Sequence, residues 1–306
     1  MRPGAVLADP EAGHVDDVVD LDRYPIDQPA SATPWRDLTA HVHTELAADG
    51  AVRLPGFLRP AALAIMATDI AKRAVYVPIR EQRASVYASS CSEAADDSAG
   101  GNVGATASPD PRHRELTWVA GHVTRDMIPA YTDAHRLYVS AAFKRFVAAV
   151  VGAERVYEYA DPLAGLVATV LPPGGAYPWH YDTNEFVLTI VLQQGDVGGA
   201  FEYYRDLRRP GDENLDGLGE VLAGTAPPPR SSRCAPGDLS IFRGRYSLHQ
   251  VTPVAGTRNR HTLVLSYADR PGVIGPLERT RSVYGRVTEQ HLMAASKSIG
   301  ADGLIL

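Results

Sequence analysis

The region between residues 155 and 268 constrains the fold most strongly, because short apolar runs alternate there with turn residues. Residues 166–171 and 185–193 are rich in β-branched and aromatic side chains, which is typical of buried strands. The predicted strands cover residues 166–171, 185–193, 200–204, 239–242, 248–251 and 262–267. About six short strands separated by turns indicate a double-sheet jelly roll rather than βαβ units. We therefore predict a mainly β protein with flanking helices and a ligand pocket at the mouth of the roll.

The 306 residues suffice for one elaborated domain with a sizeable core. We expect an N-terminal arm over residues 1–32 and a single domain over 33–306, with a helical part (33–154) before the jelly-roll core (155–290). Residue patterns predict helices at 35–48 with Thr33 as a possible N-cap, at 60–73, at 126–151 as one or two helices, and at 212–223, with short strands at 51–54 and 85–88. Residues 92–110 are rich in Ser, Ala, Gly and Asp, and are either a lid over the pocket or a disordered insertion.

His180 and Asp182 are candidate metal ligands. Two residues apart in an extended chain, their side chains project to the same face of a strand or strand end. His249, from a later strand, would complete a set of two histidines and one carboxylate, which leaves three coordination positions open and is typical of non-haem Fe(II) oxygenases. The spacing alone is weak evidence, because His14 and Asp16 share it in a segment without apolar alternation. The strands around His180 and His249 favour this pair of segments as the metal site.

Arg260 is a candidate anion-binding residue at the start of the last predicted strand. It shares one strand face with Thr262, and Arg258 has the same parity. An inward-facing arginine is costly unless it meets an anion, and its planar guanidinium suits a carboxylate. A keto acid that chelates iron at one end needs a cation for its distal carboxylate, so we assign Arg260 and Thr262 to that role. Arg258 is a further cofactor-binding candidate, although a surface position suits it better.

The region from about residue 130 to 290 resembles the Fe(II)/2-oxoglutarate-dependent oxygenases, and in particular the BesD-type group of free-amino-acid halogenases and hydroxylases. The likeness is carried by residues 160–163, 179–186, 192–194, 199–203, 242–249, 251–254, 266–267, 270–272 and 284–286. The resemblance implies a double-stranded β-helix core, with Fe(II) on His180, Asp182 and His249. It also implies that 2-oxoglutarate chelates the iron and reaches Arg260. Substrates in this group are typically small amino acids, often basic ones.

Asp182 distinguishes among the reactions of such a group. Halogenases of this type carry a small residue in place of the metal carboxylate, so that chloride occupies the position; here a carboxylate fills it. We therefore predict an oxygenase that uses Fe(II), 2-oxoglutarate and O2 to hydroxylate an unactivated C–H bond of a free amino acid or derivative in specialised metabolism, and that does not halogenate. One alternative keeps these cofactors but performs desaturation or cyclisation, such as cyclopropane formation. Another is a non-catalytic, cupin-like protein that binds a metal or ligand.

Substrate-binding residues are harder to predict. Trp179 either forms a wall of the metal site or packs under the sheet, and Asn184 either donates to substrate or stabilises the loop of the motif. Arg80, Glu81 and Arg83 precede the predicted strand at 85–88 and are candidates for lining the mouth of the pocket. A solvated charge cluster is the more common explanation for such a group.

Composition excludes several classes of protein. The net charge of −6 gives no basic surface for nucleic acid, and no apolar run is long enough to span a membrane. The N-terminus lacks the features of a secretory leader, so Cys91 and Cys234 are expected to stay reduced. These features predict a cytoplasmic enzyme with a small amino-acid-like substrate and no nucleic-acid or membrane partner. A homodimer is the default expectation.

Overall fold

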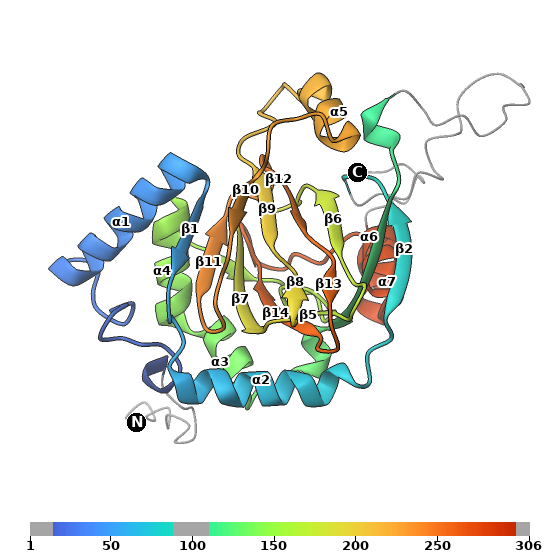
Figure 1. The fold of residues 1–306 in the computed structure, drawn as a ribbon. Coiled ribbons are helices and arrows are strands. Elements are labelled where there is room, and N and C mark those ends of the chain that lie inside the picture. The colour runs from blue at the N-terminus through green and yellow to red at the C-terminus, as the bar shows by residue number, and fades with distance from the viewer. Residues whose placement is uncertain (1–14, 88–109, 298–306) are drawn as a thin grey trace, which may run out of the picture.

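The computed structural model describes residues 15–87 and 110–297. Residues 1–14 with His14, Cys91 and nearly all of the predicted lid at 92–110 lie outside the described residues. Two antiparallel sheets form the centre of the fold, and helices cover the outer face of the larger one (Figure 1). The protein is thus a jelly roll with flanking helices, as predicted.

The larger sheet has the order β1-β11-β7-β14-β5-β3-β2. Its strands are β1 (Ala51–Leu54), β2 (Arg80–Ala84), β3 (Leu116–Val123), β5 (Leu166–Leu171), β7 (Val187–Gln193), β11 (Leu239–Phe242) and β14 (Arg260–Leu265). The smaller sheet, in the order β10-β9-β12-β6, comprises β6 (Tyr177–His180), β9 (Phe201–Tyr204), β10 (Arg230–Ser232) and β12 (Leu248–Val251). Two-residue strands form two further ladders: β4 (Tyr157–Glu158) with β15 (Tyr267–Ala268), and β8 (Val197–Gly198) with β13 (Val254–Ala255).

The helices are α1 (Thr33–Asp49), α2 (Pro60–Ala74), α3 (Asp133–Val139), α4 (Ala141–Val151), α5 (Leu215–Ala223), α6 (Leu277–Tyr284) and α7 (Glu289–Lys297). Among the described residues, short 3-10 helices cover Val15–Asp17, Pro111–His113 and Arg125–Met127. Most of the predicted helices and strands are therefore present near the expected positions. Thr33 lies inside α1 rather than capping it, because Ala32 occupies the N-cap position and Pro34 follows in the first turn.

Alternation along the strands gives the larger sheet two different faces. Leu263 and Leu265 of β14 are fully buried in the main core, together with Ile190 of β7 and with Phe143 and Phe146 of α4. On β14, Arg260 and Thr262 have the opposite parity, so they face the space between the two sheets. The helix-covered face therefore holds the apolar core, and the face turned toward the smaller sheet carries the polar side chains.

The larger sheet of the jelly roll includes strands from the N-terminal half of the chain that the sequence analysis did not assign to it. β2 and β3 extend the larger sheet on one side and β1 closes it on the other, so the core does not begin at residue 155. The strand predicted at 85–88 is wrong for its described residues 85–87, because β2 ends at Ala84 and a turn follows. The charged sequence of β2 suits its place at the edge of the sheet. Residues 15–32 also differ from a free arm, since Val19 and Ile26 are fully buried in the core.

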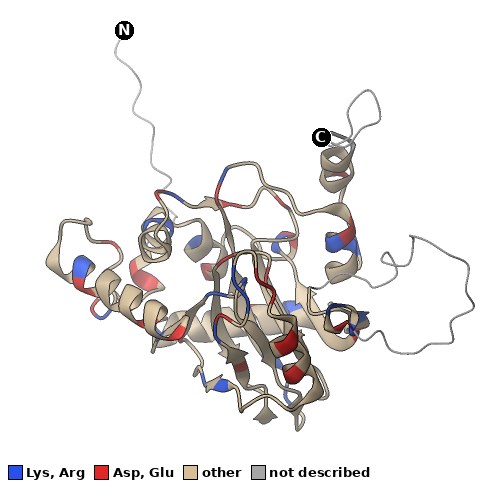
Figure 2. Cartoon of the chain, turned by 90° about the horizontal axis from the view of Figure 1, so that it is seen from above, with Lys and Arg blue, Asp and Glu red and all other residues tan. Residues whose placement is uncertain are grey.

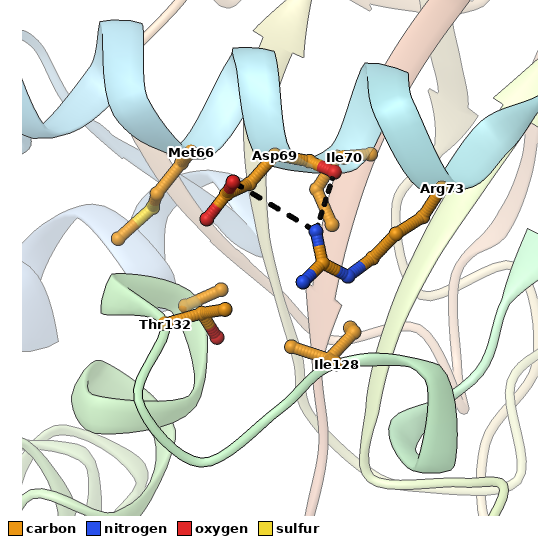
Figure 3. Close-up of a pocket in the computed structure, with 7 residues that line it drawn as sticks. Met66, Asp69, Ile70, Arg73, Ile128 and Thr132 are labelled. Carbon is orange, nitrogen blue, oxygen red and sulfur yellow. Dashed lines mark hydrogen bonds and ion pairs between the residues drawn. The ribbon is translucent and has the colours of Figure 1, made fainter.

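A small pocket lies between α2 and the segment that leads into α3, on the helical side of the larger sheet (Figure 3). Arg73 crosses it and donates from Nη1 to the backbone oxygen of Asp69 at 2.9 Å and from Nε to that of Met127 at 2.8 Å. The Asp69 carboxylate lies 3.8 Å from Nη1. These contacts satisfy the arginine, so the pocket joins α2 to the neighbouring segment and presents no free charge to a ligand.

Asp161 ties the C-terminal helices to the roll and is itself fully buried. Its Oδ1 accepts from the amides of Leu163 and Ala164, and its Oδ2 accepts from the amide of Gly275. The ring of His291 on α7 contacts the same Oδ2 at 2.9 Å. One carboxylate therefore joins a loop, the segment before α6 and α7 across 130 residues of sequence.

Replacing Asp161 by alanine is expected to destabilise the protein by about 3 kcal/mol or more, because it leaves several buried donors without an acceptor. The change is measured as the midpoint of urea unfolding. Asp269→Asn is the control: among the described residues this exposed carboxylate pairs with exposed Arg270 alone, so its loss should cost under about 0.5 kcal/mol. Equal midpoints for the Asp161 variant and wild type would contradict the role of this cluster.

Charges of both signs are interspersed along the described elements, as Figure 2 shows from above. Within the described ranges, no helix combines the length and the apolar character needed to cross a membrane.

Candidate metal and cosubstrate site

His180 and His249 lie opposite each other on adjacent strands of the smaller sheet. They are direct partners in the β12–β6 ladder, and their ring centroids are 4.1 Å apart. Nδ1 of His180 contacts the backbone oxygen of Pro178 at 2.7 Å, and Nδ1 of His249 contacts that of Ser247 at 2.9 Å. Because a carbonyl accepts a proton from each Nδ1, both Nε2 atoms are left with a free lone pair for a metal.

Asp182 follows the end of β6 and completes the group. Its Oδ2 lies 3.3 Å from Nε2 of His249, and its Oδ1 lies 4.0 Å from Nε2 of His180. One ligand atom from each residue falls within 4.8 Å of the other two. The backbone amide of Asp182 donates to the oxygen of Gly244 at 3.1 Å, which joins this loop to the segment before β12. The three predicted ligands therefore converge.

The electrostatics of these groups suit a divalent metal. Burial lowers the pKa of His180 to about 3, so its ring is neutral and free to coordinate at physiological pH. Burial alone would raise the pKa of Asp182, but His249 and His180 outweigh it and the pKa is lowered, so the carboxylate is ionised. Oδ2 of Asp182 is buried without a hydrogen bond within the described ranges. Two imidazoles and an ionised carboxylate fit a non-haem Fe(II) ion.

The absence of a side chain at Gly244 leaves space for the carboxylate of Asp182. A Cβ added at Gly244 would lie 2.7 Å from Cγ of Asp182 and closer still to Oδ2. We expect Gly244→Ala to displace the carboxylate and to weaken Fe(II) binding about 10- to 100-fold, the usual effect of disturbing the support of a ligand. Chelator competition measures the affinity. Gly219→Ala is the control, because an added methyl there meets nothing within 4 Å, and equal Fe(II) affinities in the two variants would contradict the prediction.

Arg260 is 7% exposed and lies on the inner face of β14. Its Nη1 donates to the Thr262 hydroxyl, and its Nε has no hydrogen bond partner in the described structure. Burial lowers the pKa of Arg260 to about 10, so the side chain remains charged at neutral pH. Its stem packs against Gly199, where an added Cβ would lie 2.7 Å from Cδ. A buried guanidinium between the two sheets, with no ion pair among the described residues, is suited to the distal carboxylate of 2-oxoglutarate.

Arg258 is not brought to this site. It lies in the turn before β14, is exposed, and pairs with Asp196 at 3.0 Å, so it is not part of the anion clamp. β14 begins only at Arg260, so strand alternation does not place the Arg258 side chain on the same face as that of Arg260. Thr262, in contrast, is buried directly beside Arg260.

The remaining candidates lie in different surroundings. Trp179 packs against Tyr204 on the outer face of the smaller sheet, with ring centroids 5.3 Å apart, because it alternates with the inward-facing His180. Asn184 accepts from the Tyr159 hydroxyl at 2.8 Å and donates to the backbone of Tyr267, which fits a loop-stabilising role.

Glu81 and Arg83 point away from the site. Both are exposed and share one face of β2, and Arg83 pairs with Glu115 at 3.2 Å. Arg80 is also exposed, but it has the opposite parity and shares a face of β2 with Gln82 and Ala84.

Several aromatic residues around the ligands were not predicted. The Trp118 ring on β3 lies 4.8 Å from that of His180, and Phe242 on β11 lies 4.9 Å from that of His249. His122 on β3 contacts the hydroxyl of Tyr177, whose ring packs against His180 at 5.7 Å. A strand at 116–123, with its alternating Trp118 and His122, is the signal in the sequence that could have identified this wall.

Comparison with known proteins agrees with this arrangement. The family model described as halogenase D matches residues 117–280, just over half of the chain. The carbocyclase SnoK from nogalamycin biosynthesis is 16% identical with a TM-score of 0.50, covering 78% of this chain and 88% of its own. The epimerase SnoN from the same biosynthesis is 12% identical with a TM-score of 0.50, covering 76% and 83%. Both are described as non-haem and α-ketoglutarate-dependent. No curated protein matches the sequence significantly.

The chain belongs to the halogenase D family and is an Fe(II)/2-oxoglutarate-dependent oxygenase. The two solved structures share its jelly-roll fold. Because the chain belongs to an enzyme family, the alternative of a non-catalytic cupin-like protein is rejected.

Proposed function

We propose that the protein hydroxylates an unactivated C–H bond of a free amino acid or amino-acid derivative, with Fe(II) held by His180, Asp182 and His249. The observation that carries the proposal is the carboxylate of Asp182, which lies among the metal ligands of a chain from a family named for halogenation. A carboxylate in that position occupies the coordination site that a halide needs. Its negative charge also opposes the binding of chloride.

The residues of the chain have distinct roles in this reaction. His180 and His249 present Nε2 because backbone carbonyls hold their Nδ1 atoms. Arg260 and Thr262 hold the distal carboxylate of 2-oxoglutarate, and Trp118 and Phe242 pack beside the imidazoles and limit the access of water. When bound, iron and 2-oxoglutarate supply the oxidising power, with O2, for cleavage of an unreactive C–H bond. The protein contributes orientation and a dry pocket.

A panel of amino acids incubated with Fe(II), 2-oxoglutarate, oxygen and chloride tests the proposal by product mass. A gain of one oxygen atom in the substrate, matched by succinate, is the expected result. Replacement of hydrogen by chlorine would contradict the role of Asp182. Loss of two hydrogen atoms would show desaturation or cyclisation and would overturn hydroxylation as the main reaction.

A further inference from the structure

Arg279 is a half-buried cation on α6 without a hydrogen bond or ion pair to any described residue. Two charged neighbours on the same helix behave differently, since Glu278 and Arg281 are exposed and pair with each other at 2.8 Å. The start of α6 is fixed by the amide of Gly275, which donates to the buried Asp161. A rigidly anchored helix therefore carries an arginine whose charge is not neutralised within the described structure.

α6 borders the metal site. Tyr284 at its end packs edge-on against His122 of β3, with ring centroids 5.5 Å apart, and a contact through Tyr177 leads from His122 to His180. Burial raises the pKa of Tyr284, and the positive charge of Arg279 acts against this shift. Arg279 therefore lies on a helix that packs against the wall of the metal site.

A second cation lies at the other end of the same helix. The Arg80 guanidinium on β2 lies over Gly285, where an added Cβ would overlap it, and α6 is seen beside β2 in Figure 1. Arg80 is exposed to solvent and forms no ion pair within the described ranges. Burial, together with the charge of Arg80, lowers the pKa of His122 to about 4. Two cations thus lie toward opposite ends of α6, beside the wall that includes His122 and Trp118.

The carboxylates near this wall already have hydrogen bond, ion pair or proposed metal partners. Asp161 accepts from backbone amides and His291, and Glu158 pairs with Lys144 at 2.8 Å and Arg125 at 3.3 Å. Asp182 belongs to the metal ligands. A substrate with a side-chain ammonium group therefore finds no free carboxylate in this described wall, whereas an anionic substrate finds two cations.

The wall also offers neutral polar atoms. Gln82 and Trp118 are cross-strand partners on β2 and β3. Oε1 of Gln82 and Nε1 of Trp118 are both buried without a hydrogen bond in the described structure, and Trp118 is only 6% exposed. A buried donor and a buried acceptor without partners are costly unless a polar ligand meets them. One buried donor and one buried acceptor near His180 are thus available to a polar ligand.

We propose that Arg279 binds a carboxylate of the substrate and Arg80 a second anionic group, so that the enzyme acts on an acidic amino acid rather than a basic one. This inference deepens the proposed hydroxylase function and rests on it. A guanidinium binds a carboxylate through two parallel hydrogen bonds, which an amide or ammonium group does not reproduce.

Calorimetric titration of the Mn(II)-loaded protein, saturated with 2-oxoglutarate, tests the inference without turnover. The probes are L-aspartate, L-glutamate and L-2-aminoadipate, compared with L-glutamine and L-lysine. We expect one of the three acids to bind about tenfold or more tightly than glutamine or lysine, and Arg279→Gln to weaken it by about tenfold or more. Arg281→Gln on the same helix is the matched control and should leave the affinity unchanged.

Several results would overturn the inference. These are no binding by any of the three acids, tighter binding of lysine, or equal affinity in Arg279→Gln and wild type. Weaker binding of 2-oxoglutarate in Arg279→Gln would assign this arginine to the cosubstrate instead. The two proposals fail separately: acid binding through Arg279 with a chlorinated product contradicts hydroxylation alone. Hydroxylation of lysine with no effect of Arg279→Gln contradicts the acidic substrate alone.

Discussion

Replacing His249 by alanine is expected to abolish 2-oxoglutarate turnover and to weaken Fe(II) binding by more than about a hundredfold. That is beyond the loss usually seen when only the support of a ligand is removed. The reason is geometric: His249 is 4% exposed, and its Nε2 lies 3.3 Å from the Asp182 carboxylate. Without it, the described site retains one imidazole and one carboxylate. Succinate formation and chelator competition measure the two effects.

The control for this variant must show that the fold survives. Phe201 and Phe242 pack against the His249 ring, so the alanine variant also opens a small space in the core. Circular dichroism and thermal unfolding of the metal-free proteins separate loss of structure from loss of metal. His43→Ala, at an exposed position on α1, should bind Fe(II) like wild type. Turnover retained by a folded His249→Ala protein would refute the assignment of this ligand.

Replacing Arg260 by methionine is expected to raise the KM for 2-oxoglutarate by about 30- to 1000-fold, which corresponds to about 2–4 kcal/mol for the loss of one partner of a buried charge pair. The side chain lies between the two sheets and is joined to Thr262, while its Nε has no partner in the described structure. Steady-state succinate formation as a function of 2-oxoglutarate concentration measures the change.

The Arg260→Met variant should lose affinity for 2-oxoglutarate without losing stability. A buried guanidinium that lacks an anion destabilises the cosubstrate-free protein, so Arg260→Met should unfold no earlier than wild type. Arg258→Met is the matched control, because exposed Arg258 pairs with Asp196 and should leave the KM unchanged. An increase in KM for Arg258→Met but not for Arg260→Met would reassign the clamp.

Local patterns in the sequence were sufficient to select the three candidate metal ligands that the structure brings together. His180 ends β6, Asp182 follows it, and His249 lies in β12, while alternation alone placed Arg260 and Thr262 on one inner face. The jelly-roll class followed from the same strands. Arg258 shows the limit of this reasoning, because parity has no meaning where the residue precedes the first ladder pair.

The substrate side of the site depends on contacts that are distant in sequence. β2 reads Arg-Glu-Gln-Arg-Ala and shows no apolar alternation, so its place at the sheet edge follows only from pairing with β3. The position of α6 depends on the link from Asp161 to Gly275 and His291. Arg279 therefore gave no local signal, and an arginine in a charged helix is ordinarily a surface residue.

The central claim is that one site binds Fe(II) on His180, Asp182 and His249 and 2-oxoglutarate on Arg260. Anaerobic titration of the Fe(II)-loaded protein with 2-oxoglutarate tests it directly, through the visible charge-transfer absorption of the chelate. We predict a band that saturates at one equivalent per chain, requires much more 2-oxoglutarate in Arg260→Met, and is absent in His249→Ala. A wild-type protein without the band, or both variants titrating like wild type, would contradict the account.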